Sequence, residues 1–326
     1  MSSWLQIVLI CIALILLCRI LGFVLRKFEI GSAIISIASK YIMILVIVGT
    51  VANTLGFGYL SWLQYAVILI FLKLPITTSF QTVYQVLGMI VPYFRCKFRL
   101  PSKENYIAKE NYILPFTGKW TVVNGGLTKK LSHSWSLLPQ RYAYDFIIID
   151  DEGKSFSGDK RSVNSYYCYG IDVVAPANGV VVGLYDRYKD TFVDGKNAYC
   201  DSSHIAGNNI IIKHNDSEYS GIAHLMPGSV NVKKGDIVKQ GEVIAKCGNS
   251  GNSSEPHIHF QLQSGKSFFL SAGLPIAFSD IKSRKKENYS MFDKRPCDDN
   301  LQVEGNKSYI GRGLEVENKP GAGTRI

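Results

Sequence analysis

The chain has few of the features that mark cysteine-based or nucleic-acid-binding proteins. Its seven cysteines include no C-x-x-C pair, which argues against a cysteine-built zinc site and a thioredoxin-type redox motif. The formal net charge is +10, but no arginine-rich stripe or nucleic-acid motif accompanies it. We therefore expect no nucleic-acid partner, and an anionic lipid or cell-wall polymer fits this charge better.

Charged residues are also scarce in the N-terminal third. Residues 4–25 form an apolar stretch in which Arg19 is the only charged residue, and its length matches the ~20 residues that a helix needs to span a bilayer. Arg19 lies toward one end, where it can reach the headgroups, whereas a signal peptide places its charges before a shorter apolar core. From Tyr41 to Phe94 the only charged residue is Lys73. The pattern predicts a retained membrane region over residues 1–97, with three to four transmembrane helices.

The basic residues beside these predicted helices favour opposite orientations. Arg26, Lys27 and Lys40 favour a cytoplasmic loop after the first helix and hence an outside N-terminus. A second cluster directly follows the last helix and favours a cytoplasmic C-terminal part: Arg95, Lys97, Arg99 and Lys103. We expect the basic residues of the first loop to determine the orientation, with four transmembrane helices in all. The chain is then a multi-pass protein of the cell membrane, with its C-terminal domain in the extracellular space.

The pattern changes after Leu100 to short β-branched runs separated by turn residues. Such runs predict a mainly antiparallel β domain, because no long stretch between residues 120 and 280 has helical periodicity. Gly235 and Gly241 fall where strands would turn back tightly. We expect a linker at 98–119, the β domain at 120–280 and a polar, loosely packed tail at 281–326.

Two histidines stand close together in the segment PHIHF at 256–260. Alternate side chains of a strand share a face, so His257 and His259 are expected to point the same way. Both could bind one metal ion, or one could bind it while the other reaches the substrate. The H-x-H pattern alone is a weak signal, since two surface histidines on a strand would look the same.

A longer combination of motifs resembles a known family. The segment GIAHLMPGSVNVKKGDIVKQGEVIAKCGNSGNSSEPHIHFQL is similar to the second half of the lysostaphin-like M23 metallopeptidases, which combine an A-H-L segment, a G-x-S-G turn and a P-H-x-H-F strand. Upstream, YGIDVVAPANGVVVGL and GNNIIIKH resemble two further strands of that family. The resemblance implies a hammerhead-type β fold and a peptide-bond hydrolase that holds one zinc ion.

The resemblance also implies a role for each site residue. His259 corresponds to the zinc-binding histidine of H-x-H, and His257 and His224 correspond to the two catalytic histidines. The family's compact H-x-x-x-D is missing, and eleven residues separate His133 from Asp145 here. This spacing resembles a subgroup with an enlarged segment between the two ligands, so we predict His133, Asp145 and His259 as the zinc ligands.

Alternatives exist for several of these positions. Asp172, just before the A-P-x-G strand, competes with Asp145 as the carboxylate ligand, or it caps a turn. His133 could be an exposed loop histidine, while His204 in a polar loop and His214 at a non-ligand position are not predicted as site residues. Separately, a polar insertion is flanked by two cysteines that could pair in an oxidising compartment, Cys168 and Cys200.

The predicted ligand set suggests a mechanism. Three protein ligands leave a tetrahedral zinc position open for water, and water in such sites has its pKa lowered to about 7. No H-E-x-x-H supplies a glutamate base, so His224 and His257 are expected to move protons and stabilise the oxyanion. The resemblance implies peptidoglycan or another peptide as substrate.

Two other functions compete with this interpretation. An inactive M23-like scaffold or regulator of cell-wall hydrolases would keep the same fold. A biotinyl or lipoyl carrier would share the strands of VKKGDIVKQGEVIAKCG, but it needs a modifiable lysine at a hairpin tip, which we do not find, and has no use for H-x-H. The sequence indicates no oligomeric state.

Overall fold

The computed structural model describes residues 87–88, 90–193, 204–298 and 302–322. Most of the predicted membrane region lies outside these residues. Within them, no helix combines the length and the apolar character needed to cross a bilayer. Residues 81–326 form one compact unit.

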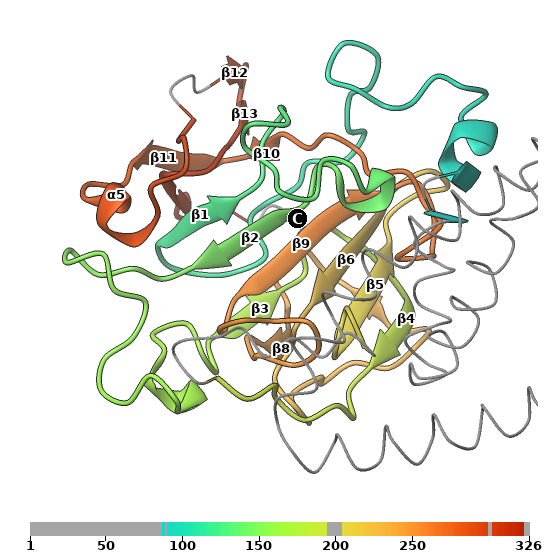
Figure 1. Ribbon diagram of the computed structural model, residues 1–326. Coiled ribbons are helices and arrows are strands. Elements are labelled where there is room, and N and C mark those ends of the chain that lie inside the picture. The colour runs from blue at the N-terminus through green and yellow to red at the C-terminus, as the bar shows by residue number, and fades with distance from the viewer. Residues whose placement is uncertain (1–86, 89, 194–203, 299–301, 323–326) are drawn as a thin grey trace, which may run out of the picture. The chain divides into compact units, whose positions relative to one another are not determined.

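Antiparallel strands dominate this unit, as the sequence predicted (Figure 1). The main sheet has nine strands, which in spatial order are β11 (Ile281–Lys285), β14 (Leu314–Asn318), β1 (Trp120–Asn124), β2 (Tyr144–Ile147), β9 (Ile258–Gln263), β6 (Tyr219–Ala223), β5 (Asn209–Lys213), β4 (Gly179–Tyr185) and β7 (Ile237–Val238). Strand β9 lies between β2 and β6 near the middle of the sheet, so neighbours on both sides fix its register.

Smaller elements surround the main sheet. A three-stranded sheet contains β10 (Phe278–Ser279), β13 (Lys307–Tyr309) and β12 (Gln302–Glu304), and a two-stranded sheet contains β3 (Asp172–Val174) and β8 (Val243–Lys246). The helical turns are η2 (Leu138–Gln140), η3 (Val163–Ser165) and α5 (Tyr289–Phe292). The two glycines expected at turns, Gly235 and Gly241, have φ values of +100° and +81°, a region that favours glycine.

The apolar core lies against one face of the main sheet. Phe146, Ile258 and Phe260 are fully buried there, and Phe116 stacks on Trp120 with ring centroids 4.8 Å apart. Full burial of each such side chain stabilises the fold by roughly 1.5–3 kcal/mol. Since side chains alternate along a strand, the residues between these apolar positions project to the opposite face.

The segment expected to be a linker, residues 98–119, differs from that expectation. Tyr112, Leu114 and Phe116 are completely buried in the core. Glu218, also fully buried, accepts hydrogen bonds from the hydroxyl groups of Tyr106 (2.5 Å) and Tyr112 (2.9 Å). The segment is thereby attached to the hairpin formed by β5 and β6.

The C-terminal residues also differ from the loosely packed tail that composition suggested. Strand β14 pairs with β1, and β11 pairs with β14, so residues 281–285 and 314–318 extend the main sheet. Glu315 lies 2.6 Å from Arg284 and 3.1 Å from Lys286 across this edge. Charged residues that look like a solvated tail in the sequence are therefore paired with one another between strands.

Candidate active site

Four residues form a row across the middle of the main sheet. Asn124 of β1 is the cross-strand partner of Asp145 in β2, Asp145 is the partner of His259 in β9, and His259 is the partner of Ala223 in β6. Cross-strand partners project from the same face of a sheet. The strand register alone therefore brings Asp145 beside His259, although 113 residues lie between them in the chain.

The closest contact of the site joins Asp145 to His259. The Nδ1 atom of His259 lies 2.9 Å from Oδ1 of Asp145, and both side chains are buried. Burial alone would raise the pKa of the Asp145 carboxyl group. The hydrogen bond from His259 and the nearby positive charge of His259, His257 and His133 outweigh burial and hold this pKa well below its ordinary value. Asp145 is therefore a carboxylate at neutral pH.

His257 approaches the same carboxylate from the turn before β9. Its Nε2 atom lies 3.7 Å from Oδ1 of Asp145. Its Nδ1 atom lies 2.8 Å from the carbonyl oxygen of Glu255 and 3.1 Å from Oγ of Ser253. A carbonyl oxygen can only accept, so Nδ1 of His257 carries the proton and Nε2 remains free to act as a base in the neutral ring.

His224 directly follows β6 and lies beside His257. The centroids of these two rings are 4.6 Å apart, and Nδ1 of His224 donates to the carbonyl oxygen of Ser250 at 2.8 Å. The backbone at His224 has a φ of +63°, which is uncommon for a residue with a side chain. Burial, then the positive charge of His257 and His259, lowers the pKa of His224 well below its ordinary value. His224 is therefore neutral.

His133 lies apart from this group, on the loop between β1 and β2. Its backbone N–H donates to Oδ1 of Asn124 at 2.8 Å, which ties the loop to the residue opposite Asp145. The residue as a whole is exposed, but the surrounding protein partly desolvates its imidazole, which lowers the pKa of the ring. The negative charge of Asp145 raises this pKa. The charges of Asp145 and His259 both act on the pKa of His133.

The alternative residues occupy other parts of the structure. Asp172 begins β3, outside the main sheet, and its Oδ1 lies 2.6 Å from Nζ of Lys246. The ring of His204 is tilted against that of Tyr188, with centroids 3.9 Å apart, and the two ring nitrogens of His214 contact the carbonyl oxygen of Asn178 and Oγ of Ser220. The thiol of Cys168 is buried and donates to the carbonyl oxygen of Pro256, while Cys200, the cysteine on the other side of the polar insertion, lies outside the described residues.

The donor atoms at Asp145 and His259 suit a zinc ion. Two ligands that each lie ~2.0–2.1 Å from a tetrahedral zinc are about 3.3 Å from each other, close to the 2.9 Å between Oδ1 of Asp145 and Nδ1 of His259. In the ranges that the structure describes, however, no three histidine, cysteine, aspartate or glutamate side chains are gathered tightly enough to hold a metal together.

Sequence reasoning missed several polar neighbours of the site. Gln261 accepts from the second ring nitrogen of His259 at 3.0 Å, and Glu255, next to His257, accepts from Oγ of Ser155 at 2.7 Å. Arg295 of the C-terminal extension donates to the carbonyl oxygen of Val123 and affects the pKa of His133. Strand alternation could have identified Gln261, two residues after His259, but no sequence signal points to Arg295.

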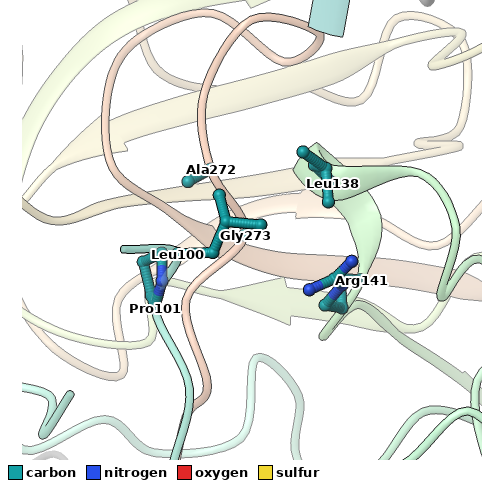
Figure 2. Close-up of a pocket in the computed structure, with 6 residues that line it drawn as sticks. All are labelled: Leu100, Pro101, Leu138, Arg141, Ala272 and Gly273. Atoms are coloured by element: carbon teal, nitrogen blue, oxygen red, sulfur yellow. The ribbon is translucent and has the colours of Figure 1, made fainter. Parts of the chain in front are cut away.

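A shallow hollow elsewhere does not belong to this site. Figure 2 shows its lining residues, which come from the segment before β1, from η2 and its C-terminal flank, and from the loop after β9: Leu100, Pro101, Leu138, Arg141, Ala272 and Gly273. The hollow contains no histidine or carboxylate, so we assign no chemistry to it.

Comparison with known proteins finds a matching family and several similar proteins. Residues 161–269 match the model of peptidase family M23. The peptidoglycan DD-endopeptidase ShyB of Vibrio cholerae is 35% identical over 98 residues, which cover 29% of this chain and 22% of that protein. An uncharacterized metalloprotease of Buchnera aphidicola is 36% identical over 83 residues, which cover 26% of this chain and 22% of that protein. The chain thus spans about a fifth of each relative.

Among solved structures, a zinc-containing peptidase from Vibrio cholerae aligns with a TM-score of 0.30 and 20% identity, over 50% of this chain and 39% of that one. The family match includes His224, His257 and His259 and begins after His133 and Asp145. Residues 161–269 of this chain are thus similar to peptidase family M23.

Proposed function

We propose that this chain is a zinc-dependent endopeptidase that cleaves peptide bonds in bacterial peptidoglycan, with His133, Asp145 and His259 as metal ligands. The observation that carries the proposal is the contact between Asp145 and His259, with the rings of His224 and His257 beside it. The similarity to peptidase family M23 and to a protein named as a peptidoglycan DD-endopeptidase supports it. When bound, zinc would polarise the scissile carbonyl group and acidify a water molecule.

The chain's own histidines would handle the protons. His257 holds its Nδ1 proton on the carbonyl oxygen of Glu255, so its Nε2 atom can accept a proton from the attacking water. His224 holds its Nδ1 proton on the carbonyl oxygen of Ser250 in the same way. Burial, and then the positive charge of a protonated His257, lowers the pKa of His224, so a proton taken from the water would stay on His257. That proton is available to the leaving amine.

Digestion of purified sacculi by the full chain tests the proposal. We expect soluble peptide-containing fragments, loss of activity when a chelator removes the metal, and recovery when zinc is added back. His259→Ala serves as the control, since it removes a proposed ligand and should be inactive with or without added zinc. Intact sacculi in the presence of stoichiometrically bound zinc would contradict hydrolysis and favour the scaffold or regulator alternative.

A further inference from the structure

Strand β9 carries a row of polar side chains that extends away from the candidate site. His259, Gln261 and Gln263 alternate with Phe260 and Leu262, so all three polar residues project from the same face. They are nevertheless buried, with relative exposures of 7%, 1% and 0%. Buried amide groups need partners, because an unpaired one costs about 1–3 kcal/mol.

These three side chains form a continuous chain of hydrogen bonds. The Nε2 atom of His259 lies 3.0 Å from Oε1 of Gln261, and Nε2 of Gln261 donates to Oε1 of Gln263 at 2.5 Å. The chain ends where Nε2 of Gln263 donates to the backbone carbonyl oxygen of Gly265 at 2.7 Å.

The backbone carbonyl group at the end fixes the direction of every bond in the chain. A carbonyl oxygen can only accept, so Gln263 must turn its NH₂ group toward Gly265 and its oxygen toward Gln261. Gln261 must then turn its NH₂ group toward Gln263 and its oxygen toward His259. An amide oxygen also only accepts, so Nε2 of His259 must carry a proton. This orientation follows from chemistry and needs no hydrogen positions.

We propose that Gln261 and Gln263 are positioning residues that keep the Nε2 proton on His259 and leave its Nδ1 atom to face the metal beside Asp145. The inference rests on the proposed function, because it assigns these residues to the same metal site. The two glutamines do not touch the metal, the substrate or the reacting atoms. They act through the orientation and protonation of one ligand, a role for which losses of 10–100-fold in metal affinity are typical.

The neighbouring strand leaves room for this chain of hydrogen bonds. Gly221 of β6 is the cross-strand partner of Gln261. A Cβ atom at Gly221 would lie 3.3 Å from Cγ of Gln261 and 3.4 Å from Oε1 of Gln263. Even the smallest side chain at this position would crowd Gln261 and touch Gln263, so a glycine suits this position.

The test compares variants of the full-length chain by zinc affinity, measured by competition with a chelator. Gln261→Met keeps the size of the side chain but removes the acceptor, and we expect zinc affinity to fall roughly 10–100-fold. Gln263→Met frees the Gln261 amide to rotate, and we expect a smaller loss, on the order of tenfold. Gln261→Glu keeps an acceptor for the Nε2–H group of His259, and its zinc affinity should stay within about threefold of that of the wild type.

A second readout follows the proton itself. In the zinc-loaded chain with ¹⁵N-labelled histidine, the Nε2–H signal of His259 should exchange slowly with water, because it is buried and hydrogen-bonded. Its exchange should accelerate at least about tenfold in Gln261→Met and return toward wild type in Gln261→Glu. Gln240→Met is the matched control, since Gln240 also donates to backbone carbonyl groups but lies outside the site, and it should change neither readout.

The outcomes separate this inference from the proposed function. If the wild-type chain binds no zinc, the proposed function fails. If the wild type binds zinc and Gln261→Met binds it equally well with unchanged proton exchange, the positioning role is refuted and the metal site stands. If Gln261→Glu loses affinity as Gln261→Met does, packing rather than the acceptor matters, which also overturns the inference. Thermal melting of each variant shows whether it remains folded.

Discussion

His224 has a backbone conformation that few residues with a side chain adopt. Its φ of +63° is held from both sides, because its N–H donates to the carbonyl oxygen of Ala206 and its own carbonyl oxygen accepts from Gly248. Strain of this kind costs on the order of 1–3 kcal/mol and is often found at active sites. Here it accompanies the hydrogen bond to Ser250 and the position of the ring beside His257.

The role proposed for His224 and His257 leads to a separation of metal binding from catalysis. We expect His224→Ala and His257→Ala to keep bound zinc but to lose hydrolysis by roughly 10²–10⁴-fold, the usual contribution of general acid–base residues. Zinc content and digestion rate of each variant provide the measurement. Retained activity in both variants would show that neither histidine moves a proton. Loss of zinc in His257→Ala would show instead that both histidines of the H-x-H pair are ligands.

The choice of carboxylate ligand can be tested with a matched pair of variants. Asp145 lies 2.9 Å from His259, whereas Asp172 is paired with Lys246 in another sheet. We expect Asp145→Ala to lose zinc, and Asp172→Ala to retain it because that change removes only an exposed ion pair, typically worth ~0–1 kcal/mol. Metal analysis of both purified variants decides between them, and loss of zinc in Asp172→Ala alone would reverse the assignment.

At the scale of elements, Glu218 connects the segment before β1 to the hairpin of β5 and β6. Burial alone would raise the pKa of this carboxyl group. Hydrogen bonds from Tyr106, the backbone of Lys109, Asn215 and Tyr112 outweigh burial and lower the pKa below its ordinary 4.5. Because the pKa is lower in the folded state, the carboxylate stabilises the fold at pH values above its ordinary pKa. This stabilisation is lost as the pH falls through the pKa of the folded state.

We therefore expect Glu218→Gln to lower the free energy of unfolding at pH 7 by about 2–4 kcal/mol, because a neutral amide cannot accept all of these bonds. The difference between wild type and variant should shrink as the pH falls below 4.5, where the wild-type carboxylate takes up its proton. Denaturant melts at several pH values measure this. A difference that stays constant with pH would show that Glu218 acts only by packing.

Strand periodicity predicted much of the β domain but not its limits. The runs around Phe146, Ile210 and Phe260 alternate or are wholly apolar, so their burial in an antiparallel sheet followed from composition. Strands β11 and β14 were missed because their charged residues pair across strands, as Arg284 does with Glu315, and such pairing is invisible in a linear sequence. The site was only partly predictable: His257 and His259 are close together in the sequence, whereas Arg295 approaches the site only in the folded chain.

At the scale of the whole chain, the relation of the M23-like domain to a membrane is a proposal. The apolar N-terminal third and Arg26 with Lys27 support a multi-pass anchor with the domain outside, where peptidoglycan lies. Protease added to intact protoplasts should then remove the C-terminal domain, and an alkaline phosphatase fusion after Leu100 should be active. A domain that stays protected until the membrane is broken would contradict an outside location and favour an intracellular peptide substrate.

X-ray absorption at the zinc edge of the purified full-length chain tests the proposed ligands of the zinc ion. We expect one zinc per chain, surrounded by nitrogen and oxygen atoms at ~2.0–2.1 Å, with two imidazole rings and no sulfur. A sulfur shell near ~2.3 Å would make a cysteine a ligand, and a single imidazole would exclude either His133 or His259. Either result would contradict the assignment of His133, Asp145 and His259.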